Sequence, residues 1–150
     1  MEPVFKHIET FWLLGVQVHA RPDEVNYPEF WGQIGPRLAE IAPVATEQVA
    51  YGAYFCCADG FCDVFGGMAV PADTPVPDGM VMREVPAAQY AMFECDMASI
   101  GATWTAIFHD WLPTSGYVSV EHQPCFEVFA EGCHEGLVPV RIHTAVVRAG

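Results

Sequence analysis

The chain has 150 residues, of which 52% are hydrophobic and 17% are charged, so it is long enough for one well-packed domain and too apolar to be disordered. Only six lysines and arginines stand against 19 acidic residues, giving a formal net charge of −13. This balance excludes the basic surface that direct binding to nucleic acid or to an anionic membrane requires. The acidic surface either concentrates cations or serves solubility alone.

The N-terminal segment does not have the pattern of a signal peptide. The apolar run "FWLLGVQVHA" (residues 11–20) follows two glutamates and one lysine, unlike the positive start of a signal peptide, and no apolar run reaches transmembrane length. "CCADGFC" (residues 56–62) lacks the C-x-x-C spacing of a zinc site, and the six histidines are scattered, so we expect no metal and no other cofactor. We therefore expect a cytoplasmic protein in which the cysteines are reduced and mostly buried rather than paired in a disulfide framework: Cys56, Cys57, Cys62, Cys95, Cys125 and Cys133.

The first strand and helix are predicted from hydrophobic spacing. The β-prone run from Phe11 to His19 predicts a strand, and turn residues follow it. A helix is predicted to begin at Pro28 and to end at Pro43, because apolar side chains recur at helical spacing between them: Trp31, Ile34, Leu38 and Ile41.

A hairpin is predicted to follow this helix. "VAYGAYFC" (residues 49–56) reads as a strand, "ADG" (58–60) as a tight turn, and "FCDVFGGMAV" (61–70) as the returning strand. Gly66 and Gly67 suggest a bulge in the returning strand. The proline-rich segment from about 71 to 79 is a linker.

The second half repeats this order. Residues 79–94 are predicted to be extended and broken at Pro86, and residues 124–130 and 138–147 to form two further strands. Between them, an apolar stripe predicts a helix that Pro113 stops: Ile100, Trp104, Ile107, Phe108 and Trp111.

The order strand–helix–strand–strand thus occurs twice, in half-repeats of about 9–71 and 79–148. This predicts an α+β fold, a tandem pseudo-symmetric duplication within one domain spanning residues 1–150. Ligand sites are favoured in the crevice between two such halves. An offset of 74 residues between the halves matches Ala53 with Glu127.

The strand "PCFEVFAE" (residues 124–131) carries a glutamate among apolar and aromatic neighbours. Strand alternation places Cys125, Glu127 and Phe129 on one face, and Phe126 and Val128 on the other. Either the first face is exposed to water, or a group on that face compensates for the cost of burying a negative charge.

Several motifs resemble the gyrase-inhibitor-like (GyrI-like) effector-binding domain, which is also fused to AraC-type and MerR-type multidrug regulators. "WTAIFHDWLPTSGY" followed by "PCFEVF" carries the resemblance, and "YGAY", "DVFGGMAV", "VPAAQYAMFE" and "FWGQIG" fit the same family. The resemblance implies a ligand pocket between the halves, in which Glu127 lies among aromatic rings and pairs with cationic, lipophilic ligands. Physical chemistry agrees, because a desolvated carboxylate and aromatic faces both attract a cation.

The candidate ligand-binding residues follow from this pocket. Phe129 and Cys125 share the strand face of Glu127, and Tyr51 and Phe55 share a face with Ala53, so we expect them to line the opposing wall. Trp104 and Trp31 lie on the two predicted helices. Tyr90 and Phe93 fall on opposite faces of one strand, so we expect only one of them to reach the pocket.

Three functions are open from the sequence. No residues remain for a helix-turn-helix, so we expect a stand-alone module that senses or sequesters cationic amphipathic small molecules. One alternative, implied by the resemblance, is a hydrolase of strained cyclopropane-containing genotoxic compounds in which Glu127 orients or deprotonates water. The other is an acidic protein partner of DNA gyrase or of a separate transcription regulator. No nucleophile elbow G-x-S-x-G is present, so no other catalytic residue is assigned.

Overall fold

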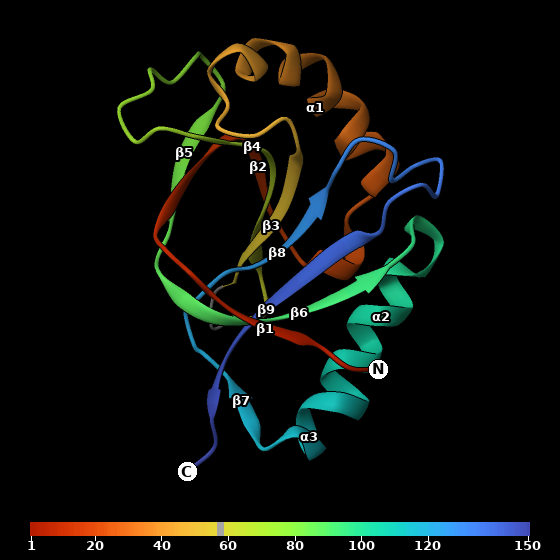
Figure 1. Ribbon diagram of the computed structural model, residues 1–150. Helices are drawn as coiled ribbons and strands as arrows, with labels where there is room; N and C mark the ends of the chain where they lie inside the picture. Colours follow the sequence, from red (N-terminus) through yellow and green to blue (C-terminus); the bar gives the residue numbers. More distant parts are fainter. Residues whose placement is uncertain (57–58) are drawn as a thin grey trace.

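The computed structural model describes residues 1–56 and 59–150 (Figure 1). Its principal helices are α1 (Tyr27–Ile41) and α2 (Ile100–Ala106), and α2 continues through a π-helical turn (Ile107–Trp111) into α3 (Leu112–Ser115). Short 3-10 turns cover Pro22–Glu24, Ala42–Val44 and Met97–Ser99. The strands are β1 (Val4–Ile8), β2 (Phe11–Ala20), β3 (Ala50–Cys56), β4 (Cys62–Val70), β5 (Val81–Val85), β6 (Ala88–Cys95), β7 (Tyr117–Ser119), β8 (Cys125–Phe129) and β9 (Val140–Arg148).

The strand order confirms the predicted α+β duplication. The antiparallel sheet runs β1-β6-β9-β8-β3-β4-β2-β5, with β7 beside β9. The strands β3 and β8 pair at its centre. Outward from β3 lie β4 and then β2 of the first half, and outward from β8 lie β9 and then β6 of the second half. The strands β1 and β5 each join the edge of the other half, which the sequence did not predict.

The two faces of the sheet have different coverings. On one face α1 packs on β2 and β4, and the helix that begins with α2 packs on β6 and β9 through Ile107 against Phe93 and Ile142 (Figure 1). The other face carries a separate apolar core that includes Leu13, Phe65 and Tyr90. The helices therefore lie apart on one face, each above its own half.

The prediction that Pro113 stops the second helix is wrong. Helical structure continues to Ser115, and Gly116 ends it in the left-handed conformation with φ 81°. Proline has no N–H to donate, but here it directly follows the wide turn in which the N–H of Leu112 reaches back to the carbonyl of Ile107. Pro113 also occupies the first turn of α3, where its missing donor costs little.

The predicted bulge at Gly66-Gly67 is also wrong. The pairing of β4 with β2 runs without interruption from Ala20 opposite Cys62 to Trp12 opposite Val70. The glycines instead permit close approach, because a Cβ on Gly67 would lie 2.1 Å from the carbonyl oxygen of Leu14.

The prediction that all cysteines are reduced is wrong for one pair. Cys56 and Cys62 form a disulfide that joins the ends of β3 and β4, where the hairpin register places them directly opposite each other. Cys95, Cys125 and Cys133 are free thiols. Cys57 and the first residue of the predicted "ADG" turn lie outside the described residues. Within the described chain, no helix has the length and apolar character to cross a membrane.

Candidate functional site

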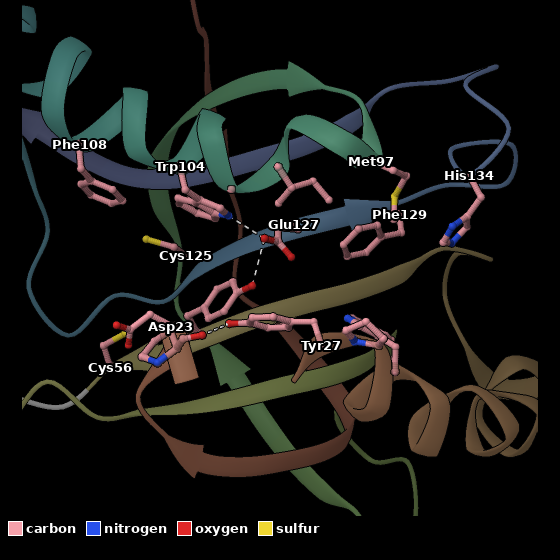
Figure 2. A pocket seen from close by; sticks show the side chains of 16 residues that line it. Asp23, Tyr27, Cys56, Met97, Trp104, Phe108, Cys125, Glu127, Phe129 and His134 are labelled. Atoms are coloured by element: carbon pink, nitrogen blue, oxygen red, sulfur yellow. Dashed lines mark hydrogen bonds between the residues drawn. The ribbon is translucent and has the colours of Figure 1, made fainter. Parts of the chain in front are cut away.

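A cavity of about 810 Å³ lies between α1 and α2, above the central strands β3 and β8 (Figure 2). Both halves contribute to its wall, as expected for a crevice between pseudo-symmetric units. The first half supplies Pro22, Asp23, Tyr27, Pro28, Trp31, Tyr54 and Cys56. The second half supplies Met97, Ile100, Gly101, Trp104, Phe108, Cys125, Glu127, Phe129 and His134.

Glu127 projects from the middle of β8 into this cavity and is only 3% exposed. Its Oε2 accepts two hydrogen bonds, from the indole Nε1–H of Trp104 at 2.6 Å and from the phenol of Tyr54 at 3.0 Å (Figure 2). The strand partner of Glu127 is Gly52, and a Cβ there would lie 2.9 Å from Oε1. The absent side chain of Gly52 therefore leaves space for the carboxylate.

Burial governs the titration of this cluster. It raises the pKa of Glu127 above its ordinary value, and the hydrogen bonds from Trp104 and Tyr54 oppose that rise because they favour the charged form. Burial, together with the nearby charge of Glu127, raises the pKa of Tyr54. The phenol of Tyr54 therefore stays protonated and remains a donor to the carboxylate.

Aromatic rings surround the carboxylate. Trp31 meets Phe129 edge to face at 5.5 Å between ring centroids, and Tyr54 meets Trp104 in the same manner at 5.9 Å. Phe108 stacks on Trp104, also at 5.9 Å. These contacts hold the rings in place around the cavity, where a bound cation could meet a ring face as well as the carboxylate.

The charged groups of the cavity wall are acidic. Asp23 and Glu127 line it, and no lysine or arginine appears among the lining residues that the structure describes. Glu127 therefore meets only neutral hydrogen-bond donors among the described side chains. A desolvated carboxylate with this environment gains strongly from a cation that enters the cavity.

Five of the nine candidate residues line this cavity: Glu127, Phe129, Trp104, Trp31 and Cys125. The other four lie elsewhere. Tyr51 packs on Phe126 in the core of the opposite sheet face, where Tyr90 also lies. Phe55 packs on Phe65 in that same core, and Phe93 lies beneath the second helix against Trp111.

The misplacement of Tyr51 and Phe55 has a single cause. The structure sets Gly52, not Ala53, beside Glu127, so the even-numbered side chains of β3 face the cavity. A shift of one residue moves every side chain of a strand to the other face. Tyr90 and Phe93 do lie on opposite faces of β6, but the prediction that one of them reaches the cavity is wrong, because no residue of the fully described strand β6 lines it.

Tyr54 is the most consequential residue that the sequence reasoning missed. It lies two positions after Gly52 on the cavity face of β3 and donates directly to Glu127. A signal was present, because glycine within a strand often marks close approach of another group. Reading Gly52 as the neighbour of the glutamate would have placed Tyr54 in the site.

Comparison with known proteins identifies the family of the chain. The family described as "Integron-associated effector binding protein" (Cass2) matches residues 5–143. A DNA gyrase inhibitor of Erwinia billingiae is 32% identical over 88 residues, which are 55% of this chain and 56% of that protein. The transcriptional regulator BrlR of Pseudomonas aeruginosa is 31% identical over 83 residues, 55% of this chain and 31% of the regulator. The chain thus aligns with just over half of the first relative and with less than a third of the second.

A solved structure shares the fold. SAV2435 bound to tetraphenylphosphonium superposes with a TM-score of 0.84 and 14% identity, covering 98% of this chain and 94% of the other. These findings confirm the resemblance to GyrI-like effector-binding domains that the sequence motifs predicted.

Proposed function

The chain belongs to the integron-associated effector-binding protein family, and on that premise we propose that the cavity between α1 and α2 binds lipophilic cations through Glu127. One observation carries the proposal: a carboxylate that is 3% exposed receives only neutral donors, Trp104 and Tyr54, from the described side chains. Burial without a cationic partner costs such a carboxylate its hydration free energy, and the attraction to a cationic ligand offsets that cost.

The site can attract a cation that has no N–H groups. Both hydrogen bonds from described side chains reach Oε2, so Oε1 is left to face the ligand. The surrounding rings offer dispersion and cation–π attraction, which do not depend on hydrogen-bond direction. A permanent, delocalised cation with aromatic substituents fits these features, and the tetraphenylphosphonium held by SAV2435 belongs to that class.

The size and composition of the cavity support broad rather than single-ligand specificity. A volume of about 810 Å³ lies in the range of sites for drug-sized molecules. The wall is almost wholly apolar or aromatic, and its deepest charge is the single carboxylate of Glu127. Such a site selects for charge and lipophilicity and imposes few directional demands.

Charge selectivity is the first test. Tetraphenylphosphonium and tetraphenylborate have nearly the same shape and opposite charge. We expect the cation to quench tryptophan fluorescence in a saturable manner, because Trp31 and Trp104 line the cavity, and the anion to give no saturable change. Equal binding of both ions would show that the cavity recognises lipophilicity alone and would refute a role for the charge of Glu127.

Binding of this cation is also expected to depend on pH. Burial raises the pKa of Glu127, so the carboxylate becomes neutral at a higher pH than an exposed glutamate does. Tetraphenylphosphonium itself does not titrate, and its affinity should therefore fall on acidification, beginning above the ordinary glutamate pKa. Titrations at a series of pH values, at constant ionic strength, measure this. An affinity that stays constant while the fold is intact would contradict the assignment.

The gyrase-inhibitor relative supports a second candidate function, inhibition of DNA gyrase by the acidic surface. Electrostatic complementarity to a basic groove would make such binding strongest at low salt. A supercoiling assay with added protein, in the presence and absence of tetraphenylphosphonium, tests it. Undiminished supercoiling at low salt would exclude this function.

A further inference from the structure

A second cavity, of about 630 Å³, lies on the opposite face of β8 from Glu127. Strand alternation places it there, because Phe126 and Val128 point away from the first cavity and line the second. Residues of β1, β2, β3, β4, β6 and β9 also line it, and β1 reaches this position because it joins the edge of the other half. The two cavities therefore lie back to back on one strand.

The floor of the second cavity is aromatic. Phe11 lies 5.6 Å from both Tyr51 and Phe126, measured between ring centroids, so the three rings form one cluster. All three line the cavity. This floor suits a small aromatic or apolar group.

The rim differs from the wall of the first cavity because it carries both signs of charge. Lys6 and Arg141 supply positive charge, and Glu9, Glu47 and Glu94 supply negative charge. Arg141 also pairs with Glu94 at 3.3 Å. A rim of this kind matches a molecule that itself carries both charges, since a purely cationic or anionic molecule would meet repulsion on one side.

His143 supplies the second, independent observation. It is 4% exposed, lines this cavity and stacks on Phe126 at 4.4 Å. Its Nδ1 is buried and finds no hydrogen-bond partner in the described part of the chain. Burial, with the charges of Lys6 and Arg141 adding to it, lowers the pKa of His143 to about 4, so the imidazole is neutral at pH 7. A buried polar atom without a partner destabilises a protein, and a polar ligand group would remove that loss.

We propose that this second cavity binds small aromatic zwitterions of the amino-acid class, with the ring on Phe11, Tyr51 and Phe126. The ligand carboxylate lies towards Lys6 and Arg141, and its ammonium group lies towards Glu9 and Glu47. The neutral imidazole of His143 exchanges a hydrogen bond with a polar group of the ligand. This proposal does not rest on the function of the first cavity.

Three matched probes test the proposal on the whole chain. L-phenylalanine carries both charges, 3-phenylpropanoate lacks the ammonium group, and phenethylamine lacks the carboxylate. We expect millimolar L-phenylalanine to shift amide NMR signals of residues around the second cavity, and each singly charged analogue to bind this second cavity several-fold more weakly. Absence of shifts, equal affinity for the three probes, or shifts confined to the Glu127 cavity would each overturn the proposal.

Two variants locate the site. His143→Phe keeps the stacking on Phe126 but removes the hydrogen-bonding nitrogens, and we expect roughly tenfold weaker binding of L-phenylalanine. Lys6→Met changes an exposed side chain, and we expect binding to weaken by about threefold to fivefold for L-phenylalanine but not for phenethylamine. Unchanged affinity in both variants would refute the site.

The first cavity provides the control for these variants. Glu127→Gln should leave L-phenylalanine binding unchanged, and His143→Phe should leave tetraphenylphosphonium binding unchanged. Failure of the cation to bind would refute the function of the first cavity only. Loss of L-phenylalanine binding in Glu127→Gln would show that the probe occupies the first cavity and would overturn the second site.

Discussion

Glu127→Gln is expected to weaken tetraphenylphosphonium binding by on the order of a hundredfold, because removing one member of a desolvated charge pair costs about 2–5 kcal/mol. Glutamine keeps the size of the side chain, and its carbonyl oxygen can still accept from Trp104 and Tyr54. The substitution therefore removes the charge and leaves the donors satisfied. Calorimetric or fluorescence titration of the variant beside the wild-type protein measures the change.

Glu84→Gln is the matched control for net charge. Glu84 is exposed on β5 and does not line the cavity, so its removal changes the total charge by the same amount without touching the site. We expect wild-type affinity in this variant. An equal loss in both variants would assign the effect to the overall acidic field of the chain rather than to Glu127.

A stability measurement separates lost binding from lost folding. The pKa of Glu127 is raised in the folded state, so its stabilising contribution is complete below the pKa of the unfolded chain and is lost as the pH rises through the folded pKa. At neutral pH the ionised carboxylate should therefore weaken the ligand-free fold. Denaturant unfolding should show Glu127→Gln to be at least as stable as the wild type at pH 7, with any difference disappearing in acid.

Gly15→Ala is expected to reduce the free energy of unfolding by about 3 kcal/mol, because overpacking of a rigid contact costs this much. A Cβ on Gly15 would lie 2.1 Å from the carbonyl oxygen of Gly66 and 2.7 Å from the Cα of Gly67. Both are backbone atoms, so no side-chain rotation relieves the overlap, and β2 must move away from β4. Urea or guanidinium unfolding at pH 7 measures the loss.

Gly32→Ala provides the opposite control with the same chemical change. Gly32 lies inside α1, and an added Cβ there would meet no atom within 4 Å. Alanine favours the helix over glycine, so we expect a gain of about 0.5–1 kcal/mol. If Gly15→Ala were instead as stable as the wild type, the close packing of β2 on β4 would be adjustable and would not explain the glycines of these strands.

The fold was largely predictable because its signals are local. Helical spacing placed Trp31 and Ile34 on α1, and alternation placed Cys125, Glu127 and Phe129 on one face of β8, as the structure shows. The order of elements revealed the duplication, and the duplication predicted a cavity between the halves. The cavity wall includes five of the nine candidate residues for this reason.

The failures concern backbone pairing and hydrogen bonding that side-chain periodicity within one segment does not encode. The disulfide of Cys56 with Cys62 depends on the register of a hairpin, and the continuation of the second helix past Pro113 depends on a π-helical turn before it. The exchange of β1 and β5 between the halves has no signature in either strand, and of the two strands β1 lines the second cavity.

By itself, the sequence determined the two main helices, the strands of the repeat and the face of β8 that carries Glu127, because side-chain periodicity is a property of each segment alone. It did not indicate the strands β1 and β7. The tertiary structure decided which face of β3 meets that glutamate, bringing Tyr54 to Oε2 and turning Tyr51 and Phe55 away. The physical reason is that side chains alternate along a strand at every residue, while the register of β3 against β8 is set by packing between residues some 75 positions apart, Gly52 opposite Glu127. An error of one residue in that register would place the core side chains of β3 in the site and the site side chains in the core.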